Sequence, residues 1–313
     1  MKRWFTAGSW QKAVAVAGCD SGYGLELAKK LALERPYTLV AAGCLTSEGM
    51  TRLESLQHAN LVPVPLDVTS PTSIENFASR CQSLTPSWDV LITSVITTSD
   101  WYVELTDMDD YRKVMDVNYF GIVHTCKAML PLLKQGAKPK PGNRGKPRIL
   151  FVSSALGQVS LPKLSAICSA KHALGSFADS LRREVKPRFG IHVTVLDPSF
   201  SGNRLVINTW LASVREKHDK QSEERLEEYG CSREAFDQEN KNQMQWYTKL
   251  AVGQSAVVNR LFDYANSTTD LAVPARITMG WSNWLLFRPI ACLPYSAQDW
   301  CIAKLDRRMQ RTV

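Results

Sequence analysis

A glycine-rich turn near the N-terminus constrains the fold more than any other part of the sequence. It reads Gly-Cys-Asp-Ser-Gly-Tyr-Gly from Gly18 to Gly24, directly after the apolar run 13–17 and before a helical pattern that begins at Leu25. Glycines at this spacing let the backbone turn sharply, and they let a pyrophosphate approach the N–H groups of a helix N-terminus. A turn without a ligand is the alternative, but a buried strand that enters a helix has little need for three glycines in seven residues. The segment is therefore predicted to form a strand, a phosphate-binding turn and a helix.

Strand and helix patterns alternate up to about residue 198. Short apolar runs predict strands, and the segments between them have helical periodicity. This order predicts a single α/β domain over residues 1–313, built on a doubly wound parallel sheet with ligands at the carboxyl ends of its strands. After the first strand, the expected strands are 38–42, 61–66, 90–92, 149–153 and 192–197, and the expected helices are 48–57, 71–84, 107–133 and 165–187.

Two segments depart from this alternation. Residues 204–250 are highly charged and helix-prone, and they are predicted to form a helical lid over a substrate, with a solvated helical pair as the alternative. Residues 281–293 are strongly apolar but are interrupted by Arg288 and Pro289. This C-terminal segment is expected to close a pocket, and dimer formation and contact with a membrane surface are the alternatives.

Composition and charge limit the kinds of partner and the location expected for this chain. The eight cysteines and five histidines show no metal-ligand spacing, which predicts no metal site and reduced thiols. The net charge is +8, but five basic residues lie in the proline- and glycine-rich segment 137–148. This segment is predicted to be a solvated loop, with a membrane-facing patch as the alternative, and no nucleic-acid partner is expected. Residues 1–10 are too short and polar for a signal peptide or spanning helix. We expect a location in the cytoplasm or at the cytosolic face of an internal membrane.

Short motifs spread over the chain carry a family resemblance. Besides the glycine turn they are Ala-Gly-Cys-Leu (42–45), Leu-Asp-Val-Thr (66–69), Met-Asp-Val-Asn (115–118), Val-Ser-Ser (152–154) and Phe-Ala-Asp-Ser-Leu-Arg-Arg-Glu (177–184). From about Ala13 to the C-terminus, the chain resembles the short-chain dehydrogenases/reductases, in the branch of retinol, hydroxysteroid and mitochondrial 3-hydroxybutyrate dehydrogenases. The resemblance implies a Rossmann-type fold, a nicotinamide dinucleotide, an apolar small-molecule substrate or ligand, and a homodimer through the long helices.

The resemblance also implies which residues bind the cofactor. The end of the second strand, residues 41–46, offers neither the acid typical of NAD sites nor the arginine typical of NADP sites. The branch favours NAD, and NADP is the alternative. The residues that match the family are the glycine turn (Gly18, Ser21, Gly22, Tyr23 and Gly24), the pair at the adenine ring (Asp67 and Val68), and Lys171.

Three residues match catalytic positions of the family. Lys171 matches the lysine that binds the nicotinamide ribose and lowers the pKa of a tyrosine. Ser154 matches the serine that hydrogen-bonds the substrate oxygen, and Asn118 matches the asparagine that anchors a proton-relay water. Each has an ordinary structural explanation when taken singly. Their joint appearance in the family's order favours the catalytic interpretation.

The tyrosine of that set is absent. The family places it four residues before the lysine, one helical turn away, where a phenol can deliver a proton to a carbonyl oxygen. That position is Ile167, which can neither donate nor accept a proton and which fits the apolar face of the helix. Residues 92–95 (Ile-Thr-Ser-Val) stand where the family has Asn-Asn-Ala-Gly, and Ser199 stands where it has glycine. We expect an intact adenosine half of the site and an altered nicotinamide half.

Two functions remain open. The first is an impaired family member, a pseudoenzyme that binds a nucleotide, a lipid-like ligand or a partner protein. The second is an active NAD-dependent oxidoreductase on a steroid, retinoid or similar apolar alcohol or ketone that uses another proton donor. Candidate donors are Ser154 through a water on Asn118, Ser165, and Cys168. General acid catalysis contributes about 10²–10⁴-fold, so loss of the tyrosine predicts severe slowing.

Overall fold

Seven parallel strands form one sheet in the computed structural model, which describes residues 10–138, 145–200, 204–267 and 273–311. The strand order is β3-β2-β1-β4-β5-β6-β7, so the direction of strand addition reverses between β1 and β4. The carboxyl ends of parallel strands meet at one edge, and such a reversal is where open sheets bind ligands. The strands are β1 (Lys12–Ala17), β2 (Thr38–Cys44), β3 (Leu61–Pro65), β4 (Val90–Thr93), β5 (Arg148–Val152), β6 (His192–Pro198) and β7 (Arg276–Met279).

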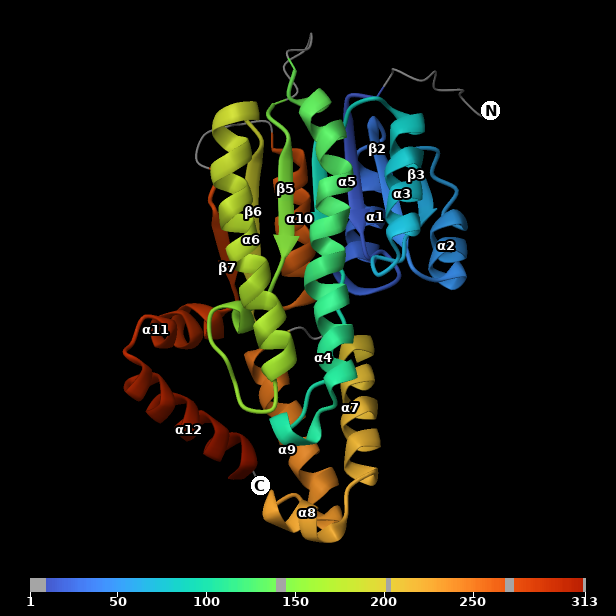
Figure 1. The fold of residues 1–313 in the computed structure, drawn as a ribbon. Coiled ribbons are helices and arrows are strands. Elements are labelled where there is room, and N and C mark those ends of the chain that lie inside the picture. Colours follow the sequence, from blue (N-terminus) through green and yellow to red (C-terminus); the bar gives the residue numbers. More distant parts are fainter. Residues whose placement is uncertain (1–9, 139–144, 201–203, 268–272, 312–313) are drawn as a thin grey trace.

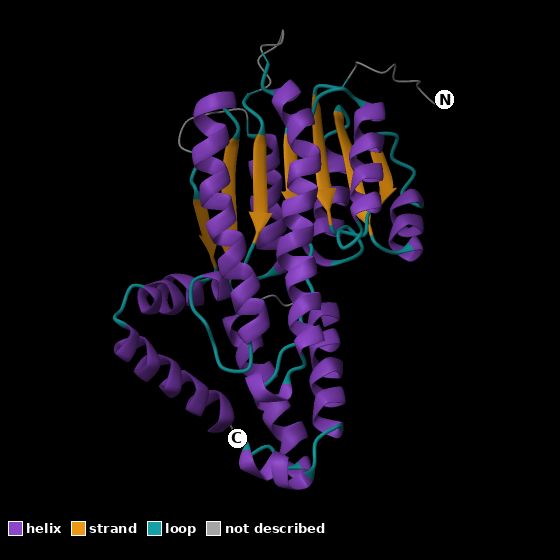
Figure 2. Cartoon of the chain, in the orientation of Figure 1, coloured by secondary structure: helices purple, strands orange, loops and turns teal. Residues whose placement is uncertain are grey.

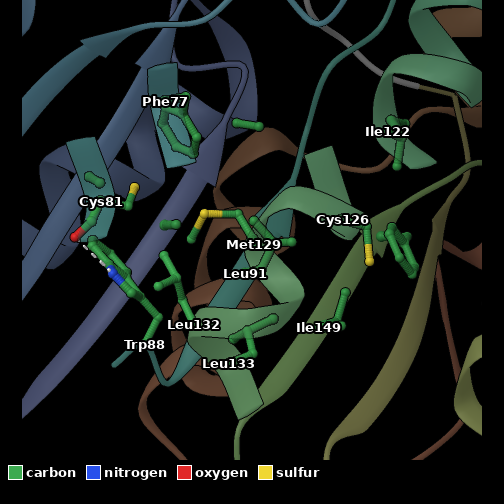
Figure 3. Close-up of a cluster of buried hydrophobic side chains, with 14 of the residues drawn as sticks. Phe77, Cys81, Trp88, Leu91, Ile122, Cys126, Met129, Leu132, Leu133 and Ile149 are labelled. Carbon is green, nitrogen blue, oxygen red and sulfur yellow. Dashed lines mark hydrogen bonds between the residues drawn. The ribbon is translucent and has the colours of Figure 1, made fainter. Parts of the chain in front are cut away.

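Helices cover both faces of the sheet because both faces of its strands are apolar. In β1, Ala13, Ala15 and Ala17 lie in one core, while Val14 and Val16 lie in the other. Figure 3 shows part of the first core, where the indole N–H of Trp88 donates to the carbonyl oxygen of Cys81 at 3.1 Å. Helices α3 (Pro71–Leu84), α5 (Gly121–Gly136) and α6 (Ser165–Phe189) cover this face, and α1 (Gly22–Glu34) and α10 (Gln254–Asn266) cover the other (Figures 1 and 2).

A third core lies beyond the carboxyl ends of the strands, in the helical region below the sheet in Figure 1. It is rich in aromatic side chains, among them Trp101, Trp210, Tyr247 and Phe287. The start of α6 contributes Ile167 to it, so the ligand edge of the sheet faces this aromatic core. The helices of this region are α4 (Met108–Met115), α7 (Arg204–Asp219), α8 (Glu223–Glu228), α9 (Arg233–Leu250), α11 (Arg288–Ala291) and α12 (Tyr295–Arg311).

The predicted doubly wound parallel sheet is confirmed, and the predicted strands correspond to β1 to β6. The single helix expected over 107–133 is instead divided into α4 and α5 by a π-helical turn, η2 (Asp116–Phe120). Strand β7 was not expected, because only one of its four residues is buried and the apolar signal is weak. Residues 204–250 contain α7, α8 and α9, and residues 281–293 contain the π-helical turn η4 (Asn283–Phe287) and α11.

Part of the predicted loop 137–148 lies outside the described residues. Within the described ranges, no helix is long and apolar enough to cross a membrane. The same part of the chain holds no group of three or more histidine, cysteine, aspartate or glutamate side chains placed to bind a metal ion. All eight cysteines are free thiols, and six of them are buried.

Candidate functional site

The glycine turn is too closely packed for other residues at two positions. A Cβ atom on Gly18 would lie 2.9 Å from the backbone of Ser94, and one on Gly24 would lie 2.0 Å from the carbonyl oxygen of Gly18. Gly18 and Gly22 also have positive φ angles, 88° and 60°, which residues with a side chain rarely adopt. Glycine at these positions is therefore required by the close packing of the turn on itself and on the loop after β4.

The N-terminus of α1 opens on the same turn. Ser21 is its N-cap residue, but the Ser21 side chain makes no capping hydrogen bond among the described residues. Tyr23 packs against the core on the α1 face of the sheet. Helix N–H groups without a side-chain cap, directly after a glycine turn, suit a pyrophosphate. The residues present thus fit the dinucleotide that the sequence predicts.

An acidic side chain from the turn reaches the end of β2. The Asp20 carboxylate accepts hydrogen bonds from the N–H groups of Leu45 and Thr46, both at 2.8 Å, and from the Thr46 hydroxyl at 2.6 Å. The Thr46 hydroxyl also caps helix α2 (Ser47–Glu54). In dinucleotide sites, an acid at this strand end binds the ribose 2′-OH. Residues 41–46 contain no such acid because the carboxylate comes from a turn 26 residues away.

Asp67 and Val68 follow β3 at the same edge of the sheet. The Asp67 carboxylate accepts from the N–H and the hydroxyl of Thr69, at 2.9 and 2.7 Å. Val68 is buried, and a Cβ atom on Gly121 would lie 2.5 Å from its carbonyl oxygen. The first turn of α5 therefore packs against this pair. Because β3, β2 and β1 are neighbours, the residues predicted for the adenosine half lie along one edge.

Lys171 lies at the carboxyl end of β5. Its side chain is 1% exposed, and Nζ donates to the carbonyl oxygen of Val152 at 3.4 Å. Burial lowers the pKa of Lys171 to about 8, because a charged amine loses hydration in the interior, and the charge of Asp197 opposes this shift. The amine is thus mainly charged at pH 7, and it loses its proton at a lower pH than an exposed lysine.

Ser154 begins a short turn that packs on Lys171. Its Oγ atom accepts the N–H of Leu156 at 3.2 Å, which caps the turn η3 (Ala155–Gly157). A Cβ atom on Gly157 would lie 3.0 Å from the carbonyl oxygen of Lys171, so the turn and α6 are in direct contact. The structure therefore brings the predicted serine and lysine to the same end of β5.

Asn118 ties the loop after β4 to the π-helical turn η2. Its Nδ2 atom donates to the carbonyl oxygens of Thr97 and Val114, both at 2.8 Å, and Oδ1 accepts the N–H of Thr97 at 3.3 Å. The side chain has no exposed surface. Its amide is therefore engaged in holding this loop, and its predicted role toward a relay water stays a prediction.

Ile167 occupies the tyrosine position in an apolar setting. It is 3% exposed and belongs to the third core. The backbone N–H groups of Ala166 and Ile167 donate to Oδ1 of Asp100, at 2.6 and 3.1 Å, so this carboxylate caps α6. Asp100 is fully buried, and burial raises its pKa. The sequence analysis did not find Asp100, because it lies 67 residues before the position it holds.

The two other donors considered on α6 have partners elsewhere. The Ser165 hydroxyl is hydrogen-bonded to the phenol of Tyr111 on α4 at 2.6 Å, and it lies about 200° around the helix from Ile167. Cys168 is 1% exposed, and its Sγ atom is directed at the carbonyl oxygen of Val159, 4.0 Å away. Burial raises the pKa of the Cys168 thiol to about 12, which makes it a weak proton donor at neutral pH.

The unusual residues 92–95, at the end of β4 and just after it, lie mainly in the cores. Ile92 is fully buried on the α1 face of the sheet, and Val95 packs against the core on the opposite face. The backbone between them lies against the start of the glycine turn. The N–H of Ser94 donates to the carbonyl oxygen of Ala17, the residue before Gly18, at 2.8 Å. An altered nicotinamide half stays a prediction.

Ser199, which stands in a glycine position of the family, is accommodated by a glycine on another element. Its side chain is 2% exposed, and its N–H donates to the carbonyl oxygen of Met279 at 2.9 Å. A Cβ atom on Gly280 would lie only 2.2 Å from Ser199 Oγ. The serine hydroxyl is therefore packed against the end of β7.

Helix α7 is joined to the rest of the site by a buried lysine. Lys217 Nζ lies 3.1 Å from Asp110 Oδ2 on α4, 2.8 Å from Ser99 Oγ and 2.7 Å from Ser213 Oγ. The Lys217 side chain is 7% exposed and that of Asp110 22%. This network connects α7 to the loop that carries Asp100. The predicted lid is therefore attached next to the start of α6.

A groove of about 740 Å³ lies elsewhere, between α7 and α9. Leu211, Arg215, Phe236 and Met244 contribute to its wall. None of the residues predicted for the site lines it.

Comparison with known proteins identifies the family. The model of the short chain dehydrogenase family matches residues 12–209, a stretch that includes the glycine turn, Asn118, Ser154 and Lys171. The chain belongs to the short-chain dehydrogenase family. Its resemblance to the hydroxysteroid and 3-hydroxybutyrate branch is confirmed by the relatives described next.

Three proteins illustrate what this short-chain dehydrogenase is similar to. It is 28% identical over 299 residues to 17-beta-hydroxysteroid dehydrogenase type 6 of Bos taurus, which covers 94% of this chain and 88% of that protein. It is 35% identical over 196 residues to mitochondrial D-beta-hydroxybutyrate dehydrogenase of Rattus norvegicus, over 60% of this chain and about half (53%) of that protein. A short chain dehydrogenase/reductase from Burkholderia phymatum, solved with NAD, has a TM-score of 0.70 at 15% identity, covers 95% of this chain and 96% of that chain, and shows the same fold.

Proposed function

We propose that this short-chain dehydrogenase binds NAD at the carboxyl edge of its sheet and is impaired as a redox catalyst. The family and the fold support a dinucleotide-binding oxidoreductase, and the glycine turn supports the dinucleotide site. When bound, NAD supplies hydride transfer. The observation that carries the impairment is Ile167, which is 3% exposed among apolar side chains at the position of the general acid. An isoleucine cannot donate a proton to a substrate oxygen.

NAD is proposed over NADP because of Asp20. Its carboxylate lies at the end of β2, where the ribose hydroxyls of a bound dinucleotide are expected. A negative charge there accepts a hydrogen bond from a 2′-OH and repels a 2′-phosphate.

An active oxidoreductase is the second candidate. The similarity to a protein named as a hydroxysteroid dehydrogenase favours an apolar alcohol or ketone. Of the three donors considered, Ser154 is the one whose hydroxyl hydrogen stays available, since its Oγ acts as an acceptor toward Leu156. Ser165 and Cys168 are directed at Tyr111 and Val159.

Two measurements separate these candidates. Titration calorimetry with NAD and NADP tests the cofactor, and we expect binding of NAD with NADP much weaker. Folded protein that binds neither dinucleotide would overturn the proposal. A turnover screen with steroid alcohols, retinol and 3-hydroxybutyrate then tests the impairment. Rates of ~1 s⁻¹ or more would overturn the impairment and favour the second candidate.

We also propose peripheral contact with a membrane surface. Trp284 and Trp300 are 55% and 59% exposed, and each has a cation over its ring, Arg288 at 5.0 Å and Lys304 at 3.7 Å. Exposed tryptophan beside a basic group is typical of side chains at a lipid–water interface. Co-sedimentation with anionic phospholipid vesicles is expected to fall when both tryptophans are changed to serine, but not when the exposed Tyr37 is changed to serine. The homodimer through the long helices stays a prediction, which light scattering would test.

A further inference from the structure

Asp197 is a buried carboxylate at the end of β6 that the proposed function does not yet use. It has no exposed surface. Its Oδ2 atom accepts hydrogen bonds from the Arg276 guanidinium at 2.7 Å and from Nε2 of Gln158 at 2.8 Å. Its carbonyl oxygen accepts from Nδ2 of Asn283 at 2.8 Å. A carboxylate removed from water is costly, so two hydrogen bonds to Oδ2 from distant parts of the chain mark a specific environment for this charge, and Asn283 holds the main chain beside it.

One of these contacts fixes the turn that carries Ser154. Gln158 directly follows η3, so its hydrogen bond to Asp197 holds the far end of the turn that Ser154 begins. The near end is held by the Ser154 hydroxyl itself, through the N–H of Leu156. Between the two ends, Gly157 packs against the main chain of Lys171. Loss of the Asp197 contact would free one end of the turn.

A second contact places charge beside α6. A Cβ atom on Gly175, one turn after Lys171, would lie 3.1 Å from Nη2 of Arg276. The glycine therefore leaves space for the guanidinium that pairs with Asp197. Two charged groups face Asp197, Arg276 from β7 and Lys171 from α6. The charge of Asp197 raises the pKa of Lys171, against the lowering by burial.

We propose that Asp197 is a positioning residue for Lys171: held by Gln158 and Arg276, it keeps the buried amine charged and orients the Ser154 turn beside it. With isoleucine at position 167, Lys171 has no phenol one turn away, so an acid from β6 is its electrostatic partner. A charged amine can donate hydrogen bonds to the ribose hydroxyls of a dinucleotide, and a neutral amine does so more weakly. This inference rests on the proposed NAD site for its role, but it makes a claim about the protein without ligand.

The decisive measurement is the titration of Lys171 itself. Protein with lysine labelled by ¹³C at Cε is titrated by NMR, and the Lys171 signal is assigned by its loss in Lys171→Met. The unmodified protein is expected to show a midpoint at about 8. In Asp197→Asn the midpoint is expected to move down by about one pH unit or more, because removal of a nearby negative charge disfavours the charged amine. An unchanged midpoint in folded Asp197→Asn would reduce Asp197 to a structural ion-pair partner and overturn the proposal.

Two further variants keep the test interpretable. Asp179→Asn removes an acid from α6, the helix that carries Lys171, where Asp179 forms an exposed ion pair with Arg182. This variant is expected to leave the Lys171 midpoint unchanged. If Asp197→Asn does not fold with Arg276 unpaired, the double variant Asp197→Asn/Arg276→Gln removes both charges. The midpoint is expected to fall by a smaller amount in that variant, because loss of the Arg276 charge favours the charged amine, and a midpoint that does not fall would also overturn the proposal.

The binding experiment separates this inference from the proposed function. Affinity for NAD is expected to weaken above about pH 8 in the unmodified protein and at a correspondingly lower pH in Asp197→Asn. If the unmodified protein binds no NAD at any pH, the proposed function fails while the Lys171 titration still decides the electrostatic link. If NAD binds and its pH dependence does not follow the Lys171 midpoint, the link to the cofactor is wrong.

Discussion

The backbone N–H of Ile167 lies 3.1 Å from Oδ1 of Asp100, a carboxylate without exposed surface. The start of α6 is therefore held by an acid from the loop after β4. Because α6 also carries Lys171, this contact sets the position of the lysine relative to the sheet. The same loop carries Ser99, which is bonded to Lys217 of α7.

Asp100→Asn is expected to change how stability depends on pH. Burial raises the pKa of Asp100 above its ordinary 3.8, so the folded state holds this proton more tightly than the unfolded chain. Its contribution to the free energy of unfolding is then full below about pH 4 and is lost as pH rises through the folded pKa. The unfolding free energy of the unmodified protein, minus that of Asp100→Asn, should fall over that range in urea titrations. A difference that rises with pH would contradict this expectation.

Ile167→Tyr is expected to restore proton delivery. A phenol one helical turn from Lys171 should raise turnover of an apolar secondary alcohol by ~10²–10⁴-fold. The matched control is Ile167→Phe, which adds the same ring without a hydroxyl. Both variants enlarge a side chain at a buried position, so both should lose ~1–3 kcal/mol of stability. Equal rates for the two variants would show that the missing hydroxyl is not what limits the chemistry.

Gly24→Ala is expected to abolish NAD binding and to destabilise the fold. The new Cβ atom would lie 2.0 Å from the carbonyl oxygen of Gly18, so the turn must open. Gly253→Ala is the matched control, because a Cβ atom at Gly253 would meet nothing within 4 Å. Calorimetry and thermal unfolding measure both effects. Retained NAD affinity in folded Gly24→Ala would show that the dinucleotide does not lie on this turn.

Asp20→Asn is expected to reduce the preference of the protein for NAD over NADP. Removing the charge at the end of β2 should raise the affinity for NADP relative to NAD by about tenfold, which corresponds to ~1.4 kcal/mol. Glu26→Gln removes an exposed charge from α1 and serves as the control. A ratio of dissociation constants that does not change in Asp20→Asn would exclude Asp20 from the selection of cofactor.

Lys217→Met is expected to loosen the predicted lid. The substitution leaves Asp110 without its cation and breaks the link between α7 and the loop after β4, so amide exchange over 204–250 should become faster. Because Asp110 is partly exposed, the loss of stability is expected to exceed ~1 kcal/mol but to stay below the cost for a fully buried pair. Lys220→Met, at an exposed ion pair directly after the end of α7, should change neither quantity measurably. Protection that is unaffected in Lys217→Met would argue against a lid attached at this point.

Much of the fold could be predicted from the sequence because its signals are local. Strands buried on both faces appear as continuous apolar runs, and the glycine turn is contiguous in the chain. β7 was missed because it lies at the edge of the sheet, where only Ile277 of its four residues is buried. The break between α4 and α5 was missed because it depends on the side chain of Asn118, which bonds to a loop 21 residues earlier.

The site residues could be predicted only where the interacting residues lie in one short motif of the sequence. Asp20, Asp100 and Asp197 each make their decisive contact with a residue 26 to 79 positions away. No spacing rule connects such pairs in a single sequence. Their carboxylates also resemble ordinary surface acids until the fold shows that Asp100 and Asp197 are buried.

The contact between Ser199 and Gly280 leaves the two positions unequal in what they tolerate. Gly280 has a φ angle of 92°, which a residue with a side chain rarely adopts, and a Cβ atom there would lie 2.2 Å from Ser199 Oγ. A side chain at 280 is therefore disfavoured twice, by its own backbone and by the serine. Replacing Ser199 with glycine would remove only the second restriction, so position 199 can vary more freely than position 280.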